Sequence, residues 1–147
     1  MHLIGFTLVE LAITVAIIGT LTTLAIPSYV NSLNNAKITR AIGDIRAVEK
    51  DIAAYEADHG ETPATLGAIG RGSLLDPWEN PYQFMKFTDQ NKGAMRKDRF
   101  LVPLNTSYDL YSKGKDGKSI PPLTANVSWD DIIRANDGAY VGLASGY

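Results

Sequence analysis

Apolar residues are spread unevenly along the chain, and the longest run of them lies near its start. From Phe6 to Ile26 only one side chain, Glu10, is charged. As an α-helix this stretch would be roughly 31 Å long, enough to cross the hydrocarbon core of a bilayer. The core helix of a small soluble domain rarely stays apolar on every face over this length. The run therefore predicts a membrane-spanning helix.

A cleaved secretory signal is an alternative, because Thr23–Ala25 has the small-x-small pattern of a cleavage site. Against it, the residues before Phe6 include no Lys or Arg, the apolar run is longer than is usual for a signal, and Pro27 follows closely. A plain membrane anchor leaves Glu10 unexplained, because a carboxylate within a membrane-spanning helix is costly. An acid at such a position indicates a function.

After Pro27 the pattern changes to one apolar stripe at helical spacing. Its members follow one another at intervals of three or four residues: Ile38, Ile42, Ile45, Val48, Ile52 and Tyr55. Gly60 supplies a left-handed C-cap and Pro63 prevents the helix from resuming. We therefore expect one helix from about Phe6 to His59, bent at Pro27 and amphipathic in residues 28–59.

In the remainder, residues 60–147, turn-forming residues separate short predicted elements, which indicates a small α+β head. Gly, Pro and Asn indicate a loop over residues 60–81, with at most a short helical turn. About three short strands are predicted, at Tyr82–Phe87, Arg99–Leu104 and Ser107–Ser112. Ser128 with Asp131 three residues later resembles an N-cap, and predicts a short C-terminal helix "DDIIRAN" that ends at Gly138. We expect an antiparallel sheet to pack on the helical stripe, and the aromatic C-terminal tail to pack on the head.

Composition and charge narrow the possible functions. The 147 residues are 45% hydrophobic and 20% charged with a net charge of -2, which suits one domain with an appendage and provides no basic face for nucleic acid. The short basic cluster at Arg96–Arg99 is interrupted by Asp98 and predicts a solvated loop. Cysteine is absent, and the two histidines are His2 and His59. No nucleophilic triad or transition-metal site can be assembled from these residues, so we do not expect an enzyme.

The sequence "GFTLVEL", from Gly5 to Leu11, resembles the processing site of type IV pilins and type II secretion pseudopilins. The resemblance implies that residues 1–5 are a leader, that a prepilin peptidase cuts after Gly5, and that the new terminal amine of Phe6 is methylated. It also implies that residues 6–27 are retained as a membrane anchor and filament core, with Pro27 at the family's proline position. The leader "MHLIG" lacks the usual basic residue, so either it is unusually short or translation starts upstream.

The same resemblance gives Glu10 a role. Cleavage after Gly5 would leave Phe6 with a positive amine, and Glu10 of one subunit would reach the Phe6 ammonium of its neighbour in a helical assembly. Both charges of an unpaired subunit would face lipid, which favours their pairing. We therefore interpret Glu10 as a charge that sets the register of polymerisation.

Two motifs in the head resemble, more specifically, the major pseudopilin of type II secretion. "DPWENPYQF" at Asp76–Phe84 is similar to its Asp-Pro-Trp-Gly-Asn-Pro-Tyr pattern, with Glu79 in place of the glycine. We favour a structural role over a ligand role here, because two prolines fix a turn while Trp78 and Tyr82 cover the core.

"YDLYSKGKDGK" at Tyr108–Lys118 is similar to the region of that family that forms a calcium-binding loop. Calcium prefers six to eight oxygen ligands on an irregular loop. The candidates are the carbonyl of Lys113 and the carboxylates of Asp116, Asp130 and Asp131. The plainer alternatives are an ordinary turn at Asp116–Gly117 and an N-terminal helix cap at Asp130 and Asp131.

The resemblance as a whole implies a type IV pilin-like lollipop, with a single-pass helix in the bacterial inner membrane and a head in the periplasm. Its function would be that of a pseudopilin, which polymerises into a periplasmic filament that drives protein export. Its partners would be further copies of itself, minor pseudopilins, the inner-membrane assembly platform and the prepilin peptidase. The alternatives are a surface pilin for adhesion, motility or DNA uptake, and a membrane-anchored periplasmic binding domain.

Overall fold

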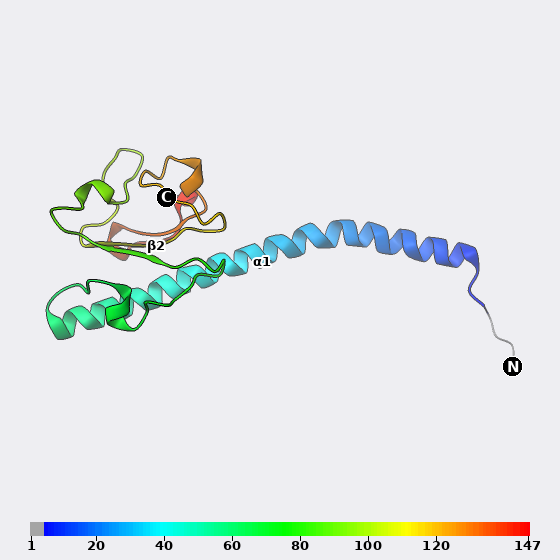
Figure 1. The fold of residues 1–147 in the computed structure, drawn as a ribbon. Coiled ribbons are helices and arrows are strands. Elements are labelled where there is room, and N and C mark those ends of the chain that lie inside the picture. The colour runs from blue at the N-terminus through cyan, green and yellow to red at the C-terminus, as the bar shows by residue number, and fades with distance from the viewer. Residues whose placement is uncertain (1–4) are drawn as a thin grey trace. The chain divides into compact units, whose positions relative to one another are not determined.

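The computed structural model describes residues 5–147, which form one long helix, α1 (Leu8–His59), and a small sheet (Figure 1). These residues fall into two compact units, one ending at Ala36 and the other spanning Lys37–Tyr147. Each unit is described by itself. The predicted leader lies outside the described residues except for Gly5.

The first unit is the N-terminal part of α1, and from Phe6 to Ile26 it is predominantly apolar on every side, with Glu10 as its one charged side chain. Every residue from Gly5 to Leu33 is exposed, and the segment is long and apolar enough to cross a membrane. The hydroxyls of Thr14, Thr22 and Thr23 each donate to the carbonyl four residues earlier, so these polar groups are satisfied within the helix. Pro27 lies inside α1 and does not end it.

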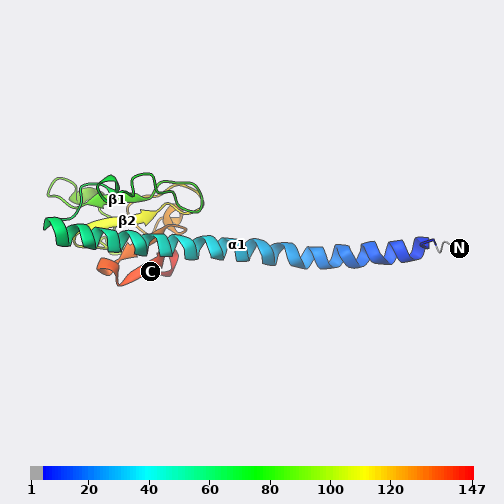
Figure 2. The ribbon, with the colours of Figure 1, turned by 90° about the horizontal axis from the view of Figure 1, so that it is seen from below.

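The second unit combines the rest of α1 with a four-stranded antiparallel sheet (Figure 1 and Figure 2). The strands lie in chain order: β1 (Gln83–Lys86), β2 (Tyr108–Ser112), β3 (Ile132–Ala135) and β4 (Tyr140–Leu143). The α+β fold predicted from the sequence, a long helix packed on a small antiparallel sheet, is confirmed.

One face of the sheet packs on the helical stripe, as the periodicity predicts. Ala41, Ile45, Val48 and Ile52 have no exposed surface, and they form the main core with Leu110 and Ile132 of the sheet. Side chains alternate between the two faces of a strand. Ile133 and Ala135 therefore belong to a second cluster on the opposite face, together with Leu104, Leu123 and Ala144. The sheet is thus covered on both faces.

The prediction of a strand at Arg99–Leu104 is wrong. The only ladder contact recorded there within residues 5–147 is an isolated bridge between Lys97 and Pro103. The carboxylate of Asp98 accepts the amides of Phe100 and Val102, and these bonds close the segment into a tight turn. The predicted strands at 82–87 and 107–112 are confirmed as β1 and β2.

The prediction of a short helix opening at Asp130 is also wrong, because this segment forms β3. The hydroxyl of Ser128 does not cap a helix; it bonds the backbone of Ile120. All four residues of β3 are buried between two layers, and a strand buried on both faces loses its polar–apolar alternation. The C-terminal tail supplies β4, which pairs with β3.

Candidate functional site

The start of the apolar helix is organised by a reciprocal cap between Thr7 and Glu10. The carboxylate of Glu10 accepts the backbone amide of Thr7 at 2.8 Å and its hydroxyl at 2.7 Å. In return the Thr7 hydroxyl accepts the amide of Glu10 at 3.2 Å. This is a capping box, which satisfies two of the free amides at a helix N-terminus. Within a single chain, the Glu10 carboxylate is therefore hydrogen-bonded to Thr7 of the same helix end.

Sequence reasoning assigned Glu10 and Phe6 to one site but missed Thr7. The signal was present, since Thr7 followed three residues later by Glu10 is a capping-box pattern at the head of an apolar run. The capping box holds the Glu10 carboxylate against the backbone amide of Thr7, the residue that follows Phe6. Gly5 and Phe6 lie outside the helix and are exposed, and the Phe6 side chain is 83% exposed. The scissile bond proposed from the sequence is thus accessible.

The turn at Asp76–Asn80 is built around the buried carboxylate of Asp76. Its Oδ1 accepts the amides of Trp78 and Asn80, both at 2.9 Å, and its Oδ2 accepts the hydroxyl of Ser112 at 2.5 Å. Glu79 stands at the tip with φ of 70°, a left-handed conformation that favours glycine. The carboxylate thus fixes a turn whose tip residue is strained.

Trp78 and Tyr82 pack on the main core, as expected for a structural turn. The Tyr82 hydroxyl donates to Asp44 at 3.0 Å and ties the turn to α1. Burial, followed by the charge of Asp44, raises the pKa of Tyr82 well above its usual range.

The loop between β2 and Ser119 contacts this turn and Asp130. The amide of Asn80 donates to the carbonyl of Gly114 at 3.1 Å. Gly114 has φ of 62°, and a Cβ there would lie 2.1 Å from the carbonyl oxygen of Asp130. The close approach therefore requires glycine at this position.

The candidate calcium ligands do not all meet. The amide of Asp116 donates to Oδ2 of Asp130 at 3.0 Å, so these two residues lie together. Oδ1 of Asp116 accepts the amide of Lys118 at 2.7 Å. Between Gly5 and Tyr147 no cluster of three or more acidic, histidine or cysteine side chains has the arrangement of a metal site. The structure thus brings together two of the candidate carboxylates, those of Asp116 and Asp130.

Asp131 is separated from that pair because it faces the interior. Its Oδ2 accepts the guanidinium of Arg96 and the hydroxyl of Ser119. Burial raises the pKa of Asp131 to about 6, against the opposing effects of Ser119 and Arg96. Asp131 therefore ties the loop to the strands by a buried ion pair and is not placed to join Asp116 and Asp130.

A second buried ion pair joins the sheet to the helix. Nε of Arg134, on β3, donates to Glu49 of α1 at 2.7 Å. Arg134 also donates to Asn105 at 3.0 Å and lies 4.1 Å from the ring centroid of Tyr108. The partners are far apart in the sequence, so no local pattern could have predicted this network.

Comparison with known proteins finds relatives that are secretion pseudopilins. The chain is 33% identical over 135 residues to the type II secretion system core protein G of Pseudomonas aeruginosa, covering 78% of this chain and 84% of that protein. It is 27% identical over 135 residues to the core protein G of Escherichia coli, covering 78% and 83%.

A fimbrial protein of Neisseria meningitidis is 35% identical over 72 residues, covering 49% of this chain and 42% of that protein. No family model and no solved structure matches the chain. The fimbrial match indicates the wider pilin-like relationship, whereas the core protein G matches extend over most of both chains. The chain belongs to the type II secretion system core protein G family, the major pseudopilins.

Proposed function

We propose that this pseudopilin polymerises into a periplasmic filament that drives protein export in a type II secretion-like system. The observation that carries the proposal is the helix surface over residues 6–26, which has Glu10 as its one charged side chain, is predominantly apolar on all sides and is entirely exposed in the single chain. Such a surface must be covered by lipid or by other subunits. A pilin-like subunit covers this surface with lipid while it is in the membrane, and with other subunits after it enters the filament core.

The first step of the proposed function is processing at the N-terminus. A prepilin peptidase cuts between Gly5 and Phe6 and methylates the new amine. The exposure of both residues ahead of the first helical turn supports this step. The helix remains as a single pass through the inner membrane, with the head in the periplasm.

The second step is a change of partner by Glu10. In the single chain its carboxylate is bonded to Thr7, which lowers the cost of carrying the acid within an apolar helix. In the filament the carboxylate instead meets the Phe6 ammonium of a neighbouring subunit. A charge-assisted hydrogen bond to an amine is stronger than one to a neutral donor, so the exchange favours assembly in register.

Calcium is a proposed cofactor of the head. Asp116 and Asp130 would hold the ion together with carbonyls of the loop, among them that of Lys113. The ion would supply positive charge between two carboxylates and restrain the loop. Asp131 is left out of this ligand set because its carboxylate bonds Arg96 and Ser119.

Intact-mass analysis of subunits taken from assembled filaments tests the processing step. The mass should correspond to a chain that begins at Phe6 and carries one N-methyl group. A mass that retains Gly5, or that corresponds to cleavage after Ala25, would contradict it.

A surface pilin is the second candidate, and the fimbrial relative supports it. It predicts that deletion of the gene abolishes surface filaments, motility or DNA uptake and leaves export intact. Under the proposed function the deletion has the opposite outcome. A membrane-anchored binding domain would require neither processing at Gly5 nor Glu10.

A further inference from the structure

The head carries a tight apolar turn that contributes nothing to its core. The turn runs from Asp98 to Val102 and is closed by backbone bonds between these two residues at 2.9 Å and from Leu101 to Asp98 at 3.1 Å. The Asp98 carboxylate also accepts the amides of Phe100 and Val102, at 2.7 and 2.9 Å. We call residues 98–102 the hairpin tip.

The hairpin tip presents three successive large apolar side chains to solvent. Phe100, Leu101 and Val102 are 71%, 66% and 55% exposed. Leu101 also has φ of 61°, a left-handed conformation that strains a non-glycine residue. A leucine side chain that is both strained and exposed gives no benefit to the isolated head. Strained positions of this kind concentrate where a protein meets a ligand or partner.

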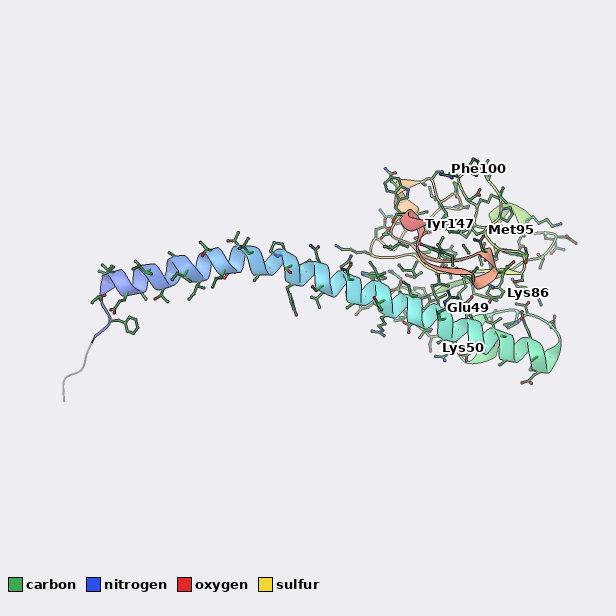
Figure 3. All side chains as sticks on the ribbon, turned by 180° about the vertical axis from the view of Figure 1, so that it is seen from behind. Glu49, Lys50, Lys86, Met95, Phe100 and Tyr147 are labelled. Atoms are coloured by element: carbon green, nitrogen blue, oxygen red, sulfur yellow. The ribbon has the colours of Figure 1, made fainter. Side chains whose placement is uncertain are left out.

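Beside the hairpin tip lies a hollow of about 530 Å3, walled mainly by aromatic and aliphatic side chains. We call it the aromatic hollow; its apolar walls are Phe100, Leu123, Trp129, Ala144 and Tyr147. In Figure 3, Phe100 lies on the side of the head away from α1.

One wall of the aromatic hollow is held in place. The Tyr147 hydroxyl donates to Asn136 at 2.8 Å, and its ring lies 5.2 Å from that of Tyr140. Trp129 nevertheless remains 50% exposed and Tyr147 45% exposed. The hollow is therefore a preformed apolar recess that nothing within residues 5–147 fills.

The charges at the rim of the aromatic hollow are compatible with a second copy of the chain as its occupant. Asp98 and Arg99 both line it, and neither forms an ion pair with another residue of the described chain. One acid and one base give a rim without net charge, which does not attract a strongly acidic or basic partner. A second copy of the chain supplies an Arg99 that can pair with Asp98, and an Asp98 that can pair with Arg99. The same copy also brings an exposed apolar side chain, Leu101, that can fill the hollow.

We propose that the hairpin tip of one copy inserts into the aromatic hollow of a second copy. Leu101 enters the recess, while Arg99 and Asp98 of one copy pair with Asp98 and Arg99 of the other. The contact deepens the proposed function and rests on it in one respect, since assembly brings the copies together. It is made by the heads, and is independent of the Glu10 contact in the stalk.

The absence of cysteine from the chain permits an unambiguous cross-linking test in cells. Two differently tagged full-length copies are co-expressed, one with Val102→Cys at the hairpin tip and one with Ser145→Cys at the aromatic hollow. Oxidation should give a disulfide-linked dimer that carries both tags. The control replaces Ser145→Cys with Ala68→Cys, an exposed position on another part of the head, and should give at least tenfold less dimer.

A third pair, with Ile17→Cys in both copies, reports assembly of the stalks. Stalk cross-links without tip-to-hollow cross-links would overturn the head contact and leave the proposed function standing. Absence of both would contradict the proposed function and, with it, the contact. A tip cysteine that cross-links to a protein other than this chain would also overturn the proposal.

Leu101→Gly separates the contact from folding. Added to the Val102→Cys copy, it removes the inserted side chain and relieves the left-handed strain, so the melting temperature of the protein should not fall. The tip-to-hollow dimer should nevertheless decrease severalfold. Glu79→Gly is the matched control, because it relieves the same strain in another turn and should leave the dimer unchanged. An undiminished dimer with Leu101→Gly would contradict the proposed insertion.

Discussion

Replacing Glu79 with glycine should stabilise the head. Glu79 holds φ of 70° because Asp76 fixes the residues on either side of it through the amides of Trp78 and Asn80. A left-handed non-glycine residue costs roughly 1–2 kcal/mol. Relief of this strain is offset by about 0.4–1 kcal/mol, because glycine makes the unfolded chain more flexible. The net expectation is a stabilisation of about 0.5–1 kcal/mol.

Thermal unfolding of a soluble head that begins at Lys37 measures this effect. That form contains every residue of both core clusters. For a domain of this size, the stabilisation corresponds to an increase in melting temperature of about 2–6 °C. Thr65→Gly is the control, because Thr65 is exposed and has φ of -148°, which any residue adopts. It should lower the melting temperature. If Glu79→Gly lowered it as well, the strain assigned to this turn would be absent.

Three further perturbations test the packing and the loop. Gly114→Ala should destabilise the head by more than 2 kcal/mol as judged by urea unfolding, because the added Cβ meets the Asp130 carbonyl; a loss below about 0.5 kcal/mol would show that the loop yields easily. Ile52→Ala should cost about 2–5 kcal/mol in the same assay, since Ile52 is fully buried against the sheet, and a smaller cost would place it outside the core. Calcium should raise the melting temperature of the head, and Asp116→Ala should abolish the shift. A melting temperature unchanged by millimolar calcium and by chelator would remove the ion from the account.

The sequence predicted the elements whose signals are local. The stripe from Ile38 to Tyr55 and the stop at Gly60 located α1, and Gly60 adopts the expected left-handed conformation. Asp76, the prolines and Trp78 likewise identified a structural turn. The same motif carried the resemblance to the family.

The sequence failed where distant partners decide the conformation. Ile132 and Ile133 face opposite sides of the sheet, so β3 shows no alternation and its sequence is equally compatible with a short helix. Arg134, a charged residue in this buried strand, pairs with Glu49, which lies 85 positions earlier in the chain on α1. Asp131 was a calcium candidate because its carboxylate follows the loop that resembles the family's calcium site. Its pairing with Arg96 could not be read from the sequence, because that contact depends on the fold.

Export by cells that carry only a Glu10 variant tests the central claim most directly. In a strain lacking the native gene, the quantity measured is the fraction of normally secreted protein that reaches the medium. The unaltered chain should restore secretion, whereas Glu10→Leu should insert in the membrane and leave the secreted proteins in the periplasm. Full secretion with Glu10→Leu, or unimpaired secretion in the deletion strain itself, would contradict the account of this chain as a polymerising pseudopilin.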